Sequence, residues 1–225
     1  MGCKRVLELY HCVDARSFRA LWALEEMGLD YRLHILPFPP RLFAPEYLKL
    51  NPLGTIPLLI DGEARMTESA AIPPYLATRY GPSPLAVGMD EPDYPLWLDW
   101  LHRSEATLTF PLTIVLRYRH LETEARRLPQ AADDYSQWFL SRLRHLTRAL
   151  QDRQWLCADR FTMADLCVGY PLMFASSLGL DHKFSPEIND YWARLSSRPA
   201  FIAAQAAQAK VTAALNAPSD DQSRP

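Results

Sequence analysis

Glu68 and Ser69 stand at the start of an apolar segment, where an acid beside a hydroxyl can hold a polar ligand. The unpaired N–H groups of a helix start favour an anion at such a place. Upstream, residues 51–54 (Asn-Pro-Leu-Gly) predict a turn, because proline presets φ and glycine supplies a positive φ. Pro57 opens a strand and leaves the backbone before it free to pair elsewhere. Residues 51–69 therefore predict a cradle for an extended peptide that carries a carboxylate.

The same segment also fits a structure that binds nothing. Asp61-Gly62 is a strong hairpin signal between two short strands. Ser69 or Thr67 could then serve as the N-cap of the helix that follows. The residues of this segment leave both interpretations open.

The N-terminal third alternates strands and helices. The apolar periodicities predict a strand at 6–10, a helix at 16–27, a strand at 31–36, a short helix near 41–50, a hairpin at 57–66 and a helix at 69–80. Gly28 is a natural stop for the first helix, and strand, helix and strand form a right-handed unit with parallel strands. Pro73 and Pro74 predict an irregular first turn in the last helix, because proline in a helix interior costs roughly 3 kcal/mol.

The rest of the chain has helical periodicity. Residues 93–120 and 131–153 each show one apolar side, and Pro111 should bend or divide the first of these helices. Thr162 and Asp165 form a capping box at the start of a further helix, a pattern that serves folding.

Composition excludes several classes of function. A net charge of −2 over 225 residues gives no electrostatic case for nucleic acid. The four cysteines have neither C-x-x-C nor zinc spacing, so a reducing compartment is favoured over a disulfide framework. No apolar run approaches membrane-spanning length and no signal-peptide core is seen, so we expect a cytoplasmic protein without a membrane partner. His102 and Glu105 share a helix face without a third ligand, so no metal is expected.

The order Asn-Pro-Leu-Gly-x-Ile-Pro, a hairpin and Glu-Ser-Ala-Ala-Ile resembles the glutathione site of the glutathione S-transferase family, in its cytosolic, bacterial type. Phe-Thr-x-Ala-Asp at 161–165 and Arg-Pro-Ala-Phe at 198–201 match the family in the same order, so the resemblance covers about residues 4–212. It implies an α/β plus all-α protein. The expected parts are a thioredoxin-like βαβαββα domain (1–81) that binds glutathione, a linker (82–92), an all-helical C-terminal domain (93–215) and a disordered tail (216–225).

The resemblance also implies how glutathione is held. Ile56 would offer its backbone to the cysteinyl part, next to a cis bond between Ile56 and Pro57. Glu68 and Ser69 would hold the γ-glutamyl end. The full set of expected contacts is Arg16, Thr55, Ile56, Pro57, Glu68 and Ser69.

Two of these contacts carry open questions. Thr55 stands where many relatives have a lysine that reaches the glycyl carboxylate, and Arg41 is a candidate substitute for the lost charge. Arg16 is either a charge partner of the thiolate or an exposed residue of the first helical turn.

The departure from the family lies at the group that should activate the thiol. The family's Ser or Cys position falls on Asp14 and its Tyr position on His11. Asp14 would repel a thiolate unless it is protonated or turned away, and it also fits an N-cap for the helix 16–27. Cys12 is the other catalytic candidate, because Arg16 and a helix start can lower a thiol pKa and permit a mixed disulfide. Cys12 equally fits a small buried residue.

The favoured function is conjugation of glutathione to a hydrophobic electrophile, a detoxification reaction, by a homodimer. The aromatic residues Tyr10, Phe38, Phe110 and Tyr118 could line a pocket for that second substrate. The alternatives are a glutathione-dependent thiol-disulfide reductase and a non-catalytic glutathione-binding or scaffold protein. Glutathione is the ligand in all three cases.

Overall fold

The computed structural model describes residues 6–216. Residues 217–225, which make up most of the expected tail, lie outside the described residues, and Asn216 closes the last helix. Contacts divide the chain into two compact units. The first contains residues up to Thr67 together with those from Pro199 onward, and the second runs from Glu68 to Arg198.

The first unit is built on a four-stranded mixed sheet with strand order β2-β1-β3-β4. Its strands are β1 (Leu7–His11), β2 (Tyr31–Ile35), β3 (Leu58–Asp61) and β4 (Ala64–Met66). β1 runs parallel to β2 and antiparallel to β3, and β3 runs antiparallel to β4. This is the expected thioredoxin-like arrangement, in which the connection from β1 to β2 is a helix because parallel strands need a crossover.

The helix α1 (Phe18–Met27) provides that crossover, and its first seven residues are all buried. It ends at Gly28, whose φ of 60° is left-handed and whose N–H donates to the carbonyl of Glu25 at 3.2 Å. The expected stop is therefore confirmed. Two short helices, α2 (Pro40–Phe43) and the 3-10 helix η1 (Pro45–Lys49), replace the single helix expected at 41–50.

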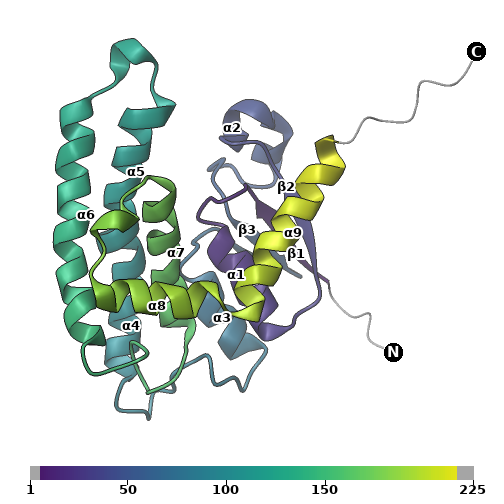
Figure 1. The fold of residues 1–225 in the computed structure, drawn as a ribbon. Coiled ribbons are helices and arrows are strands. Elements are labelled where there is room, and N and C mark those ends of the chain that lie inside the picture. The colour runs from purple at the N-terminus through teal and green to yellow at the C-terminus, as the bar shows by residue number, and fades with distance from the viewer. Residues whose placement is uncertain (1–5, 217–225) are drawn as a thin grey trace, which may run out of the picture. The chain divides into compact units, whose positions relative to one another are not determined.

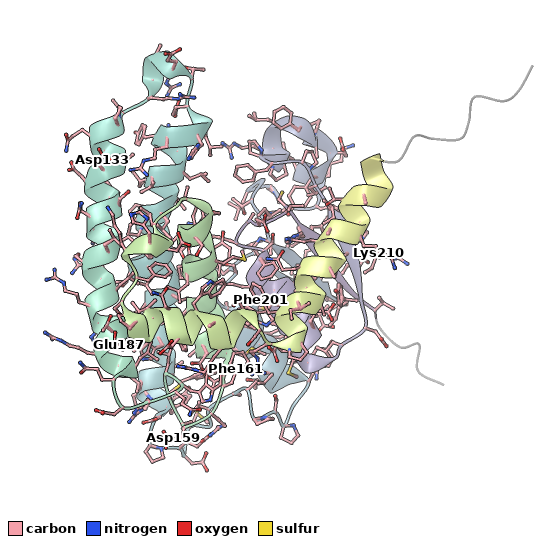
Figure 2. The ribbon with its side chains drawn as sticks, viewed as in Figure 1. Asp133, Asp159, Phe161, Glu187, Phe201 and Lys210 are labelled. Carbon is pink, nitrogen blue, oxygen red and sulfur yellow. The ribbon has the colours of Figure 1, made fainter. Side chains whose placement is uncertain are left out.

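The last helix, α9 (Pro199–Asn216), belongs to the first unit and packs against α1 (Figure 1). Phe201, labelled near the start of α9 in Figure 2, meets Phe18 and Trp22 edge-on at ring distances of 5.3 and 5.0 Å. Phe201, Ala204 and Gln208 are buried at helical spacing, so one face of α9 is committed to this contact. The compact units group α9 with the sheet and α1, because this buried face packs against α1. The domain division expected at 82–92 stays a prediction.

The second unit is helical within the described residues. Its longer elements are α3 (Ile72–Arg79), α4 (Tyr94–Arg103), α5 (Phe110–Leu116), α6 (Pro129–Leu150), α7 (Met163–Ser177) and α8 (Pro186–Ser196), joined by the π-helical segments η2 (Ser104–Thr109) and η3 (Arg117–Leu121) and the 3-10 turns η4 (Glu124–Arg126) and η5 (Asp181–Lys183). α7 is buried along almost its whole length. α4 and α8 pack on α7 and on α6 respectively.

Prolines set several helix boundaries in this unit. Pro73 and Pro74 are the second and third residues of α3, where backbone N–H groups have no intrahelical acceptor. Residues 69–71 form a turn before the α-helix begins at Ile72, so the irregular first turn expected for the helix 69–80 is confirmed. Pro111 is the second residue of α5, directly after the π-helical segment η2, so the expected division of helix 93–120 is confirmed.

The segment 82–92 has no helix or strand, and hydrogen bonds from Arg160 hold it in place. The guanidinium donates to the carbonyls of Pro84 and Ala86 at 2.8 and 2.9 Å. It also forms a two-pronged ion pair with Glu91, which lowers the pKa of that carboxyl to about 2. These contacts fix the path of the segment without regular structure.

The expected capping box at the start of α7 is confirmed. Thr162 Oγ1 accepts from the Ala164 N–H at 3.2 Å, and Asp165 Oδ2 accepts from the Thr162 N–H at 2.8 Å. Asp165 Oδ1 additionally accepts from the Leu156 N–H and the Tyr191 hydroxyl, both at 2.9 Å. Burial raises the pKa of Asp165 to about 6, because it outweighs these donors.

We therefore predict that Asp165→Ala lowers the free energy of unfolding by about 3 kcal/mol or more, because it leaves several buried donors without an acceptor. Thr162→Ala should cost only ~0.5–2 kcal/mol. The exposed Asp133, labelled in Figure 2, serves as the control, since Asp133→Ala removes only a surface ion pair. Denaturant unfolding of the full chain measures all three. Equal losses for Asp165→Ala and Asp133→Ala would contradict the assignment.

Candidate functional site

The candidate site lies where β1 ends beside the start of β3. Tyr10 is opposite Leu58 in the antiparallel pair, so continuing this register by two residues brings Cys12 opposite Ile56. The peptide bond between Ile56 and Pro57 is cis, as the sequence resemblance implied. Cys12 and Ile56 thus lie opposite each other just beyond the hydrogen-bonded ladder of β1 and β3.

Ile56 offers an unused stretch of backbone at this place. The ladder between β1 and β3 begins at Leu58, and none of the loop hydrogen bonds among residues 6–216 uses the Ile56 N–H or carbonyl. Pro57 is buried, whereas Ile56 is only partly covered. An extended peptide could therefore pair with Ile56 as an added strand would.

Tyr47, which the sequence analysis did not single out, and the turn residue Asn51 hold the peptide before Ile56. The Tyr47 hydroxyl and the Asn51 side-chain N–H both donate to the Thr55 carbonyl at 2.8 Å. Asn51 Oδ1 also accepts from the Leu53 N–H at 3.2 Å, and the Asn51 carbonyl accepts from the Gly54 N–H at 2.9 Å, which closes the expected turn at 51–54. The Asn-Pro-Leu-Gly motif signalled Asn51 as a turn residue, but nothing in the sequence linked Tyr47 to this carbonyl.

Gly54 brings Arg41 to the cradle. Its φ of 61° is left-handed, and a Cβ there would lie 2.8 Å from the Arg41 Cβ and 2.9 Å from a methyl group of Leu48. Only glycine fits both the backbone angle and the space. The Cβ of Arg41 therefore lies directly beside Gly54. Gly54 precedes the exposed Thr55, the position at which many relatives have the lysine that Arg41 was expected to replace.

Cys12 does not have the environment that was expected for a reactive thiol. Its side chain is 1 % exposed, and its Sγ lies 3.7 Å from the Pro37 carbonyl. Burial raises the pKa of the thiol to about 12. Of the two interpretations of Cys12, a small buried residue fits this environment and a lowered thiol pKa does not, because desolvation dominates at this position.

Asp14 does not cap α1. The helix begins at Phe18, and Ser17 precedes it with its hydroxyl bound to the backbone N–H and carbonyl of Cys12 at 3.2 and 3.3 Å. Asp14 instead has a left-handed φ of 55°, and its carboxylate accepts from the Gln208 side chain at 2.7 Å. The N-cap interpretation is wrong, since the turn bends Asp14 towards α9 before the helix starts. Arg16 is half-buried within this turn.

His11 is fully buried at the end of β1 and bonds to Gln208 Oε1 through Nε2 at 3.0 Å. Burial lowers the pKa of the imidazole to about 4, and the neighbouring Gln208 and Asp14 offset this only in part. His11 is therefore neutral at pH 7 and acts as a hydrogen-bond donor to the amide oxygen.

Glu68 and Ser69 are the first two residues of the second unit. Glu68 is exposed, and its carbonyl accepts from the N–H groups of Ala71 and Ile72 at 3.0 and 3.2 Å. Ser69 is buried. The residue preceding α3 is Ala71, and no side chain caps that helix, so the interpretation of Ser69 or Thr67 as its N-cap is wrong.

The four aromatic residues expected at a second-substrate pocket are divided between the units. In the first unit, Tyr10 stacks on His34 at 4.4 Å and Phe38 is exposed. In the second, Phe110 is exposed and meets Tyr135 edge-on. The second unit also contains a cavity of about 730 Å³. Its lining includes Trp100, Arg103, Trp138, Arg142, His145 and Arg148, and none of the site residues expected from sequence.

No helix among residues 6–216 is long and apolar enough to cross a membrane. Within the same residues, no three or more His, Cys, Asp or Glu side chains gather as metal ligands would.

Comparisons with known proteins show the family and the fold of the chain. Residues 5–78 match the family model described as glutathione S-transferase, N-terminal domain. The chain is 27% identical to glutathione S-transferase 3 of Schizosaccharomyces pombe over 208 residues, covering 87% of this chain and 85% of the relative. It is 30% identical to glutathione S-transferase 4 of Zea mays over 190 residues, covering 81% and 83%. The solved structure of Ure2p5 from Phanerochaete chrysosporium, cocrystallised with 1-(S-glutathionyl)-2,4-dinitrobenzene, has a TM-score of 0.82 at 23% identity and covers 96% of this chain and 100% of that one.

The buried His11 predicts an acid-sensitive fold. Its pKa of about 4 in the folded chain lies below the ordinary histidine pKa of 6.5, so the unfolded chain binds more protons between these values. Stability is lost as pH falls from 6.5 towards 4, by about 3 kcal/mol at most, because one pKa unit corresponds to ~1.4 kcal/mol. His11→Gln should flatten this slope in denaturant unfolding measured across that range. The exposed His120→Gln serves as control, and equal slopes in the two variants would contradict the prediction.

Proposed function

Because this chain belongs to the glutathione S-transferase family, we propose that it binds glutathione and joins the thiol to a hydrophobic electrophile. The sulfur of the bound thiolate forms a bond to an electrophilic carbon, a leaving group departs from that carbon with its electron pair, and the thiol proton passes to solvent. Ure2p5, whose crystals contain the glutathionyl derivative of dinitrobenzene, supports an aryl carbon as one such electrophile.

The observation that carries the proposal is the unused backbone of Ile56. The backbone of Ile56 is held in place because Tyr47 and Asn51 donate hydrogen bonds to the preceding carbonyl, that of Thr55. The cysteinyl residue of glutathione pairs with Ile56 in this proposal, which brings the sulfur towards the turn that follows β1. Such rigid backbone sites bind well because little ordering remains to be done upon binding.

The two ends of glutathione meet charged and polar groups. Glu68 and Ser69 bind the γ-glutamyl amine and carboxylate, and Arg16 adds a positive charge near the sulfur. Thr55 and Arg41 face the glycyl carboxylate, with Arg41 supplying the charge that Thr55 lacks. Charge-assisted hydrogen bonds of this kind are about twice as strong as neutral ones.

Thiol activation in this proposal uses backbone N–H groups around the start of α1 together with Arg16. A thiol of pKa ~8.5 needs such donors to ionise near neutral pH. The Asp14 side chain takes no part as a donor, since a carboxylate only accepts hydrogen bonds and this one accepts from Gln208. Cys12 is disfavoured as a nucleophile by its burial, so the reductase reaction through Cys12 is disfavoured with it. We also propose a cytoplasmic homodimer, as is typical of the family.

Titration calorimetry with reduced glutathione tests the binding proposal. We expect binding by the wild-type chain, and affinity lower by roughly ten- to a hundredfold in Glu68→Gln and Ser69→Ala, because hydrogen bonds to charged groups contribute ~1.5–3 kcal/mol. Glu63→Gln is the matched control, since Glu63 is an exposed acid of the neighbouring hairpin. An absence of heat at millimolar glutathione would refute binding, and with it both enzymatic alternatives.

Cys12→Ala distinguishes conjugation from thiol exchange. We expect the variant to conjugate glutathione to a dinitrophenyl halide at a rate within about twofold of wild type, because the buried thiol takes no part in the reaction. Activity with a glutathione mixed disulfide is measured in parallel, and circular dichroism confirms folding. If a folded Cys12→Ala variant loses more than tenfold of the wild-type activity in either assay, Cys12 is a catalytic residue and the proposal for it is wrong.

A further inference from the structure

Gln208 on α9 uses every hydrogen-bonding position of its side-chain amide. Its Oε1 accepts from His11 Nε2 at 3.0 Å and from the Asp14 N–H at 3.2 Å. Its Nε2 donates to Asp14 Oδ1 and to Gln205 Oε1, both at 2.7 Å. An amide has two donor hydrogens and two acceptor lone pairs, so Gln208 is fully satisfied.

The orientation of this amide follows from its partners. The backbone N–H of Asp14 can only donate, so it requires the oxygen of Gln208 on its side. The Asp14 carboxylate accepts, so it requires the nitrogen. Both requirements are met at once, and the amide therefore binds one residue through its backbone and its side chain together.

The helix that carries Gln208 is firmly seated. Gln208 is 3 % exposed, and Phe201 and Ala204 on the same face of α9 are also buried. By contrast, Lys210, which extends away from α9 in Figure 2, is exposed. Hydrogen bonds thus anchor the segment from His11 to Asp14 to a helix far along the chain, since 194 residues separate Asp14 from Gln208.

We propose that Gln208 is a positioning residue for the sulfur end of the glutathione site. It holds the Asp14 carboxylate on α9 and so keeps that negative charge away from the thiolate. This inference rests on the proposed function, since it requires glutathione to be bound beside the β1–α1 turn. The chemical reason is that a carboxylate turned towards the sulfur would raise the thiol pKa.

Gln208→Glu tests the inference with little change in shape. It replaces the donor that faces Asp14 with a second carboxylate oxygen, so two like charges meet at hydrogen-bond distance and Asp14 is released towards the ligand. We expect the pKa of enzyme-bound glutathione, read from thiolate absorbance, to rise by about one unit or more. At neutral pH kcat should fall by roughly tenfold, with KM for glutathione much less affected.

A swapped pair provides the rescue. In the double variant Gln208→Glu with Asp14→Asn, the new asparagine donates to the new carboxylate, and the His11 and residue-14 backbone donors keep an acceptor. The thiol pKa should return to within about 0.3 unit of wild type. Ala209→Glu adds the same charge at an exposed position of α9, so it should leave the thiol pKa unchanged.

S-methylglutathione separates positioning from folding, because it lacks an ionisable thiol. We expect its affinity for Gln208→Glu to stay within about threefold of wild type. The inference is overturned if Gln208→Glu and Ala209→Glu shift the thiol pKa equally, if the swapped pair gives no rescue, or if S-methylglutathione binding is lost as well. If the wild-type chain binds neither glutathione nor S-methylglutathione, the proposed function is overturned. If the wild-type chain binds both but Gln208→Glu leaves the thiol pKa unchanged, only the role of Gln208 is overturned.

Discussion

The antiparallel pairing of β1 with β3 is the constraint on which the candidate site depends. The register that sets Tyr10 opposite Leu58 places the end of β1 beside the Ile56 backbone, although more than forty residues separate them along the chain. A shift of one residue would exchange the buried and exposed sides of both strands, so the buried Leu9 and Leu59 hold the register. The cradle is therefore specified by the hydrophobic core of the first unit as much as by its own polar residues.

Burial then decides what each polar group at this sheet end can do. It keeps the Cys12 thiol protonated and His11 neutral, which removes two candidate reactive groups. Asp14 Oδ1 accepts a hydrogen bond that α9 supplies through Gln208. The chemistry proposed for the site thus falls to the ligand's own sulfur and to backbone donors, and the surrounding side chains mainly shape the electrostatic field around them.

Local patterns predicted what local physics determines. Gly28, the capping box of Thr162 and Asp165, and the division at Pro111 each follow from conformational preferences within a few residues. The motif at 51–69 indicated the family to which the chain belongs, whereas the peptide cradle at these residues stays a prediction. The sequence could not reveal the raised pKa of Cys12 or the bond between Asp14 and Gln208, because both depend on packing between segments far apart in the chain. The grouping of α9 with the first unit depends in the same way on tertiary contacts, which local sequence patterns do not encode.

The most direct test of the central claim is a titration of the isotopically labelled full chain with reduced glutathione, followed by amide nuclear magnetic resonance. The proposed pairing predicts that the Ile56 amide shows one of the largest chemical-shift changes and becomes protected from solvent exchange, with Asp14 shifting alongside it. Shifts that leave Ile56 unmoved and gather at Trp100 and Arg148, in the cavity of the second unit, would contradict the account.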